Sequence, residues 1–238
     1  MKLSKPSVVL VRPQMPENIG LVARAMDNSG LENLIIVNPR EKWPNNTSFK
    51  SSANSKKIIL NSKIYQSLDD ALESFNFVIA TSNRPRLLEK PFHNKFTNLF
   101  EQFPTNKKIA VLFGPENSGL SNEDLLLADI IFKINTAKSN TSLNLSHAVL
   151  LFSFAWREYF VLNNLKAKKN NSNLNIAKKK DFNYFMKFLK NELNEVGFLH
   201  PKTKSKGMFE NIQAMFLRSS LSYIEIQTLW GMIKKLRK

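Results

Sequence analysis

Short apolar runs alternate with helical patterns through the first 160 residues of the chain. Five runs are almost continuously apolar, as expected for strands that are covered on both faces of a sheet. They predict strands at residues 8–12, 34–37, 77–81, 109–113 and 130–134. Helices are predicted between them, over residues 18–29 and 68–75 and after Ser121, which forms the pattern of a capping box with Asp124. This alternation predicts an α/β fold, an open and mostly parallel sheet with helices on both faces.

A longer helix is predicted from Ser142 to about Leu162. An apolar face with helical spacing runs along it, formed by Leu145, Ala148, Val149, Phe152, Trp156, Tyr159 and Phe160. An aromatic stripe with this period is more often part of the core or of a subunit interface than a platform for stacking bases.

The remaining chain predicts a linker and a second, helical domain. Residues 163–180 contain six lysines, no acidic residue and few apolar side chains, which indicates a flexible basic linker. Asp181 is predicted to cap a helix that ends near Gly197, and two more helices are predicted at about 208–217 and 222–236. We therefore expect a first domain of residues 1–162, the linker, and a small all-helical domain of residues 181–238.

The chain is strongly basic, with a net charge of +16 and a pI near 10.0. Residues 1–160 carry 19 Lys/Arg against 14 Asp/Glu, residues 161–180 carry 6 against none, and residues 181–238 carry 10 against 5. A balance of this kind indicates a partner with many phosphates, such as RNA, DNA or an anionic membrane. The alternative explanation of the many lysines is that the chain is rich in Asn, Lys and Ile, a composition typical of an AT-rich genome. The concentration of charge after Val161 favours nucleic acid.

Other features bound the location and the chemistry. The longest apolar stretch, residues 148–156, is far shorter than the roughly 20 residues that span a bilayer, so we expect a cytoplasmic protein with no membrane partner. Cysteine is absent, and His93, His147 and His200 fall on unrelated segments. No metal site is expected from such a set.

The stretch VLFGPENSGLSNEDL, residues 111–125, is one residue away from the P-loop pattern GxxxxGK[ST]. Pro115 removes a backbone N–H group, Glu116 adds a negative charge, and Leu120 stands where a P-loop has its lysine. Such a loop suits a cationic or neutral ligand better than a triphosphate; a plain turn with two glycines is the alternative. Two other predicted strands end in polar loops, at residues 82–86 and 135–141, which predicts one shared pocket at the carboxyl ends of three strands.

Three segments carry a resemblance to a known family: NIGLVARA from Asn18, LFGPENSGL from Leu112, and SLNLS from Ser142. In this order and at these intervals they resemble the three motifs of the SpoU class of SPOUT RNA ribose methyltransferases, and most of all the TrmJ type, the tRNA cytidine/uridine-32 2′-O-methyltransferases. The resemblance covers residues 7–160 and continues more weakly into the C-terminal helices. It implies a SPOUT fold with a deep C-terminal trefoil knot, S-adenosylmethionine as cofactor, and a homodimer with the site at the subunit interface.

The resemblance also assigns roles to residues. Positions that match the family's cofactor contacts, mostly through backbone groups, are Thr81, Ser82, Asn83, Gly114, Ile134, Thr141, Ser142 and Leu143. Arg24 matches the arginine that acts at the ribose 2′-hydroxyl and reaches in from the other subunit. We interpret it as an electrostatic stabiliser of developing alkoxide, because a free arginine is effectively never deprotonated. Polar residues that hold this arrangement match Asn18, Glu116, Ser142 and Asn144.

The expected function is S-adenosylmethionine-dependent 2′-O-methylation of nucleotide 32, a cytidine or uridine, in the tRNA anticodon loop. The basic linker and the C-terminal helices are expected to hold the tRNA through its phosphates. A ribosomal RNA 2′-O-methyltransferase is one alternative, and a non-catalytic RNA-binding protein with the same fold is another. The intact set of polar residues argues against the second.

Overall fold

The protein is described from a computed structural model, which covers residues 5–83, 90–137, 139, 142–164 and 176–236. Its centre is one sheet with the strand order β3-β2-β1-β6-β4-β7-β5, and every neighbouring pair is parallel. The strands are β1 (Ser7–Val11), β2 (Leu34–Val37), β3 (Lys63–Tyr65), β4 (Phe77–Thr81), β5 (Phe92–His93), β6 (Ile109–Phe113) and β7 (Ile130–Phe132). The predicted α/β fold with a mostly parallel sheet is therefore confirmed.

All five predicted strands are present in the sheet. Strands β2, β4 and β6 have the predicted bounds, while β1 begins one residue earlier and β7 ends two residues earlier than expected. The two strands that were not predicted, β3 and β5, lie at the two edges of the sheet. Both are short and at least partly exposed, so they lack the continuous apolar run that identifies a strand buried on both faces.

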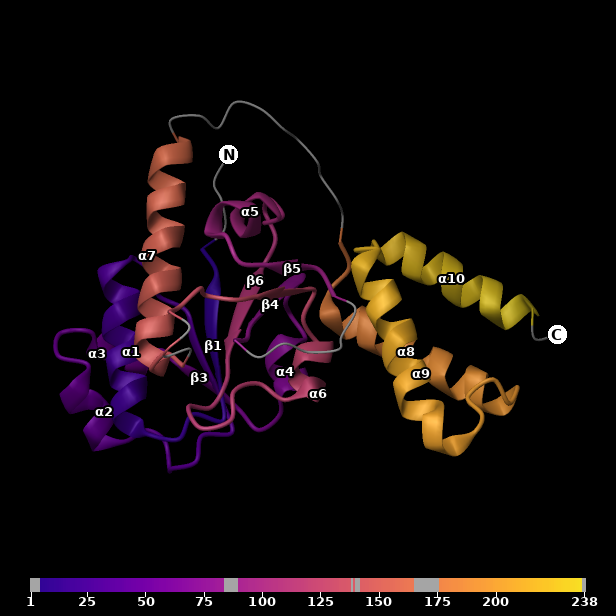
Figure 1. Cartoon of the computed structure of the whole chain (residues 1–238), viewed down its shortest axis with the longest axis horizontal. Helices are drawn as coiled ribbons and strands as arrows, with labels where there is room; N and C mark the ends of the chain where they lie inside the picture. Colours follow the sequence, from indigo (N-terminus) through magenta and orange to yellow (C-terminus); the bar gives the residue numbers. More distant parts are fainter. Residues whose placement is uncertain (1–4, 84–89, 138, 140–141, 165–175, 237–238) are drawn as a thin grey trace.

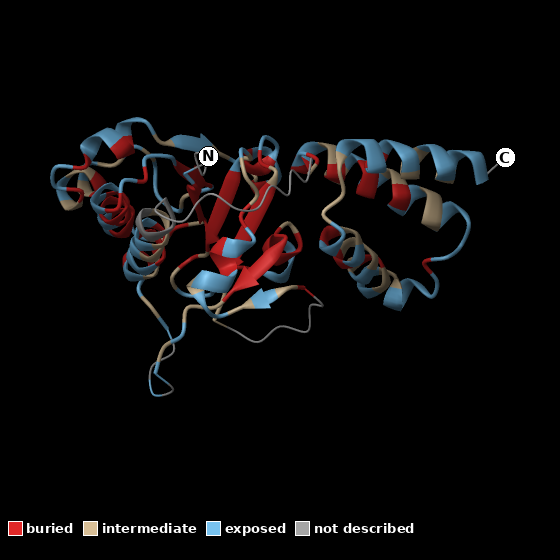
Figure 2. Cartoon of the chain, turned by 90° about the horizontal axis from the view of Figure 1, so that it is seen from above, coloured by how far each residue is buried: buried red, intermediate tan, exposed pale blue. Residues whose placement is uncertain are grey.

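Helices cover both faces of the sheet (Figures 1 and 2). One face packs against α1, α3, α5 and α7, and the other against α4 and α6. The bounds are α1 (Pro16–Asn28), α2 (Asn46–Ser51), α3 (Lys56–Leu60), α4 (Leu68–Leu72), α5 (Phe96–Glu101), α6 (Asn122–Leu126) and α7 (Leu145–Asn164). Helices α1 and α7 lie side by side. The capping box predicted from Ser121 and Asp124 is present at the start of α6.

Helix α7 begins at Leu145, three residues later than predicted. The Asn144 side chain accepts hydrogen bonds from the backbone N–H and the hydroxyl of Ser146, so it occupies the place of an N-cap. Ser142 therefore lies in the loop before the helix. The aromatic stripe of α7 is core: Phe152 and Trp156 are buried inside this chain. Tyr159 and Phe160, further along the stripe, are only partly buried.

Three helices, α8 (Lys179–Glu195), α9 (Lys202–Arg218) and α10 (Tyr223–Leu236), form a separate C-terminal group (Figure 1). They bury a core of their own around Phe185, Leu217 and Ile226. The prediction that Asp181 caps the first of these helices is wrong, because α8 starts two residues earlier and Lys178 is its N-cap residue. Asp181 lies in the first turn instead, where a carboxylate favours the helix dipole.

A buried ion pair joins the helical group to the sheet. The Lys179 ammonium pairs with Asp129, and both side chains are buried. The backbone N–H of Lys179 also donates to Phe75 O at 2.9 Å. Lys90 lies close by and donates to the carbonyls of Leu126 and Ala128. Burial lowers the pKa of Lys90 to about 7, although the charge of Asp129 acts in the opposite direction.

The segment predicted as a linker is shorter at both ends than residues 163–180. Residues 163 and 164 belong to α7, and residues 179 and 180 belong to α8. At the second of these ends, Lys179 is held by its ion pair with Asp129 in the first domain. Residues 165–175 lie outside the described part of the chain. The trefoil knot stays a prediction from the family resemblance. Within the described ranges, no helix is both long enough and apolar enough to cross a bilayer.

Candidate active site

Three loops meet at the carboxyl ends of the strands because β6, β4 and β7 are neighbours in the sheet. Their carboxyl ends lead into the loops that follow Phe113, Thr81 and Phe132. Together with the start of α7, these loops enclose a pocket of about 570 Å³. The predicted shared pocket is therefore present, at the place where parallel sheets usually bind ligands.

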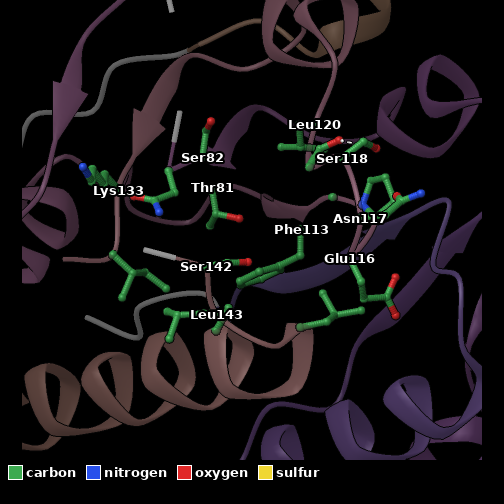
Figure 3. A pocket seen from close by; sticks show the side chains of 17 residues that line it. Thr81, Ser82, Phe113, Glu116, Asn117, Ser118, Leu120, Lys133, Ser142 and Leu143 are labelled. Carbon is green, nitrogen blue, oxygen red and sulfur yellow. Dashed lines mark hydrogen bonds between the residues drawn. The ribbon is translucent and has the colours of Figure 1, made fainter. Parts of the chain in front are cut away.

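Most of the residues predicted to contact a cofactor line this pocket, and Figure 3 shows them around it. The lining includes Thr81, Ser82, Asn83, Gly114, Ile134, Ser142 and Leu143. Thr141 lies outside the described residues. The polar loop ends supply hydroxyl and amide groups to the pocket, while Ile134, Leu143 and Leu120 supply apolar surface.

The loop after β6 closes tightly on itself. A Cβ atom added at Gly114 would lie 2.3 Å from Leu120 N and 2.5 Å from the carbonyl carbon of Gly119, so only glycine fits there. Gly119 has φ +67°, a conformation that favours glycine, and its N–H donates to Pro115 O at 2.8 Å. The two glycines are thus required by the tight folding of this loop.

Glu116 is fixed by the segment that begins α1. Its Oε1 accepts from Asn18 Nδ2 at 2.7 Å, and its Oε2 accepts from the backbone N–H of Gln14 at 2.9 Å. Asn144 Nδ2 in turn donates to Asn18 Oδ1 at 3.2 Å. Asn18, Glu116 and Asn144, which lie far apart in the chain, therefore form one hydrogen-bonded network that ties the β6 loop to the N-termini of α1 and α7.

A second set of contacts that holds the β6 loop was not predicted from the sequence. Arg12, directly after β1, makes a two-pronged ion pair with Asp124 in the first turn of α6. Asp124 also accepts from the N–H of Ser121 at 2.7 Å. These bonds hold the far end of the β6 loop to β1. The sequence showed Asp124 only as part of a capping box and Arg12 only as a strand end, and no spacing rule connects residues 112 positions apart.

The chemistry of the lining suits a ligand with both polar and apolar parts. Lys133 is the one cationic side chain among the described lining residues. The Glu116 carboxylate is already paired, and Figure 3 shows it turned away from Thr81 and Ser142. A volume of about 570 Å³ lies within the usual 300–1,000 Å³ of cofactor sites. The residues present therefore fit a nucleoside cofactor such as S-adenosylmethionine.

Arg24 lies outside this arrangement. It is an exposed residue on α1 and does not line the pocket of its own chain. Among the described residues, no hydrogen bond or ion pair of its side chain is found. His147 lies on the exposed surface of α7. In the described ranges, no group of three or more His, Asp or Glu side chains is placed to hold a metal ion.

Comparisons with known proteins add a family to this geometry. Residues 5–154 match the SpoU rRNA Methylase family. An uncharacterized tRNA/rRNA methyltransferase of Haemophilus influenzae is 30% identical over 234 residues, which cover 97% of this chain and 94% of that protein. The tRNA (cytidine/uridine-2′-O-)-methyltransferase TrmJ of Photorhabdus laumondii is 30% identical over 233 residues, 97% of this chain and 96% of that protein.

Solved structures agree with this result. The crystal structure of TrmJ from Z. mobilis ZM4 superposes with a TM-score of 0.86 at 28% identity and covers 99% of this chain and 100% of that one. The SpoU methyltransferase AviRb from Streptomyces viridochromogenes, in complex with AdoMet, superposes with a TM-score of 0.54 at 22% identity over 68% of this chain and 63% of that one. The second likeness concerns the fold alone.

Proposed function

As a member of the SpoU rRNA methylase family, this chain is a methyltransferase, and we propose that it methylates the ribose 2′-hydroxyl of nucleotide 32 in the tRNA anticodon loop. The methyl donor in this proposal is S-adenosylmethionine. One observation carries the proposal above the others: LFGPENSGL in the β6 loop and SLNLS before α7 both contribute to the pocket, and the Asn18, Glu116 and Asn144 network joins them to the NIGLVARA segment on α1.

The cofactor, when bound, supplies a methyl group on a positively charged sulfur. Thr81, Ser82 and Gly114 are proposed to position it through backbone groups, while Leu120 and Leu143 cover its apolar surface. Glu116 contributes by shaping the loop, because both of its oxygens are held by Asn18 and Gln14. A closed loop of this kind would hold the bound cofactor in one orientation, from which it would supply its methyl group to a ribose oxygen.

Arg24 is proposed to act on the ribose in the pocket of a second subunit. It is exposed and is absent from the lining of its own pocket, so a role at the reacting oxygen needs a second copy. The neighbouring surface of α7 exposes Leu151 and Phe154, which are available for such a contact. A fixed guanidinium would stabilise the negative charge that develops on the ribose oxygen in the transition state.

The choice of tRNA is supported by the relatives. Proteins named as tRNA 2′-O-methyltransferases match this chain over almost its whole length at 28 to 30% identity. The basic C-terminal helices are consistent with a large phosphate-rich substrate. A cytoplasmic location stays a prediction from the sequence.

The test is transfer of a labelled methyl group from S-adenosylmethionine to total tRNA and, separately, to ribosomal RNA. We expect label in tRNA, in a nucleotide whose 3′-phosphodiester resists alkaline hydrolysis because its 2′-oxygen is blocked. Label in ribosomal RNA alone would replace tRNA as the substrate. No transfer to either RNA, with cofactor binding intact, would support the non-catalytic alternative.

A further inference from the structure

A second pocket lies between α8 and α10, in the C-terminal group of helices. It has a volume of about 470 Å³ and is lined by Asp181, Tyr184, Lys187, Phe188, Asn191, Tyr223, Gln227 and Trp230. It shares no lining residue with the candidate active site. Substitutions here therefore leave the cofactor pocket intact, and the two sites are separable by experiment.

The lining follows helical spacing on both sides. Residues 181, 184, 187/188 and 191 repeat every three or four positions along α8, and residues 223, 227 and 230 do so along α10. Side chains at this spacing share one face of a helix. The pocket is therefore a groove between two facing stripes and not a chance gap at a helix end. We call it the α8/α10 groove.

Aromatic rings form much of the groove. Phe188 and Trp230 stack on each other, with ring centroids 4.7 Å apart and an interplanar angle of 14°, and both are half-buried. Tyr184 and Tyr223 stand in the open, with 54% and 50% of their surface exposed. A helix face turned to water is normally polar, so rings exposed along a groove mark a surface that binds something.

The charge around these rings favours a polyanion. Lys187 lines the groove, Lys180 Nζ lies 5.8 Å from the centre of the Tyr184 ring, and Lys234 Nζ lies 5.9 Å from both Phe188 and Trp230. Asp181 is the one carboxylate among the described lining residues.

We propose that the α8/α10 groove binds unpaired nucleotides of the RNA substrate. The tyrosine rings stack on the bases, the lysines pair with the phosphates, and the side-chain amides of Asn191 and Gln227 meet the base edges. A duplex is excluded from such stacking because its bases are already stacked on each other. The inference rests on the proposed function for the identity of the RNA, and it adds where a single-stranded segment of that RNA binds.

The test uses the full chain and the double variant Tyr184→Ala/Tyr223→Ala. Both side chains are exposed, so the fold should survive their truncation. Tyr184→Phe/Tyr223→Phe keeps the rings, and Phe198→Ala/Ile224→Ala removes two apolar side chains that are at least as exposed and lie outside the groove lining. Affinity is measured for tRNA, for a single-stranded RNA of ten nucleotides, and for the same RNA in a duplex.

We expect the alanine double variant to bind tRNA and the single strand at least about fivefold more weakly, because base stacking is lost. The phenylalanine pair and the control pair should bind like the wild type, and duplex affinity should not change among the variants. Lys187→Gln should reduce the salt dependence of tRNA binding by roughly one phosphate contact.

Three outcomes would overturn the inference. Unchanged RNA affinity in the alanine double variant is the first. Equal losses in the alanine pair and in the control pair are the second, and a loss of self-association without a loss of RNA binding is the third, since it would identify a second copy as the occupant. Methyl transfer by the wild type is scored in parallel. An active enzyme with a silent groove contradicts this inference alone, whereas tyrosine-dependent binding without any transfer contradicts the proposed function alone.

Discussion

Two helical regions of this protein carry aromatic side chains at the same spacing and use them in opposite ways. On α7, Phe152 and Trp156 are buried between the helix and the sheet. On α8, Tyr184 and Phe188 have the same four-residue spacing but line a groove, where Tyr184 is exposed and Phe188 is half-buried. Because the spacing is the same, the burial of the rings depends on what packs against each helix. The wide sheet covers the rings of α7, whereas the three-helix group is too small to cover those that line the groove.

The same difference extends to how each region is packed. The central strands β1, β4 and β6 are almost wholly buried, with helices on both faces. Much of the apolar surface of α8, α9 and α10 is only partly buried. A rigid sheet is suited to hold loops around a small cofactor, and a shallow helical surface is suited to meet an extended substrate. We propose that the two regions divide the work in this way.

The largest expected effect is on catalysis in the first region. Arg24→Ala should lower the rate of methyl transfer by roughly a thousandfold or more, because the charge that stabilises the alkoxide is lost. Cofactor affinity should stay within a few-fold of the wild type, since Arg24 does not line the pocket of its own chain. Single-turnover kinetics and calorimetry measure the two quantities.

A matched control for Arg24→Ala is Arg24→Lys, which keeps the positive charge and should retain part of the activity. Full activity in the alanine variant would remove the role. Restoration of activity when the Arg24→Ala chain is mixed with a chain that has an intact Arg24 but a disabled pocket would identify the second subunit as the source of the arginine.

The next effect concerns the joint between the two regions. Lys179→Met leaves the buried Asp129 carboxylate without its ion-pair partner. Loss of one partner from a buried pair costs about 3–5 kcal/mol of unfolding free energy. The neighbouring Lys180→Met removes an exposed pair with Glu73 and should cost under about 1 kcal/mol. Denaturant unfolding of both variants gives the comparison, and equal small losses would show that the helical group is attached without this pair.

A smaller effect is expected in the β6 loop. Gly114→Ala forces the loop apart, because its Cβ would overlap Leu120 N and Gly119. Cofactor affinity should fall at least about tenfold, which corresponds to about 1.4 kcal/mol, while tRNA binding persists. Gly207→Ala is the control, since nothing lies within 4 Å of the added atom and alanine favours the helix. A variant at Gly114 with normal cofactor affinity would show that the loop does not shape the site.

The smallest effect is a pH dependence at Lys90. Its pKa is lowered from 10.5 to about 7 in the folded chain, so the unfolded chain binds the proton more tightly and stability rises with pH above about 7. The contribution grows by about 1.4 kcal/mol between pH 6 and pH 8. The unfolding free energy is measured for the wild type and for Lys90→Met at both pH values. The difference between the two proteins should change by about 1.4 kcal/mol from pH 6 to pH 8. A difference that does not vary with pH would contradict the lowered pKa.

The sequence alone predicted the central strands of the sheet better than it predicted the edge strands and the contact between the sheet and the helical group. Buried strands such as β4 and β6 have unbroken apolar runs, which is why their bounds were correct, whereas the edge strands β3 and β5 have no such signal. Lys179 was misread because a lysine among lysines resembles a solvated linker, and only its distant partner Asp129 makes it a buried residue. No local pattern contains that information.

The candidate site was predictable in a different way. Residue pattern and spacing indicated a pocket at three strand ends, and most of the residues that the family resemblance selected as cofactor contacts line it. Neither revealed how the site is held. The bonds from Gln14 and Asn18 to Glu116 and the pair of Arg12 with Asp124 connect segments about a hundred residues apart, and such contacts follow from the fold. The role of each residue in catalysis stays a prediction.

The central claim is that the sheet region directs a methyl group to one ribose of a tRNA held by the helical region. The most direct test is a tRNA assembled with a single 2′-deoxynucleotide at position 32, compared with one that has the same change at position 34. Our account predicts that transfer from labelled S-adenosylmethionine disappears with the first substrate and continues with the second, while both tRNAs bind equally well. Continued transfer to the tRNA that lacks the 2′-hydroxyl at position 32 would contradict it.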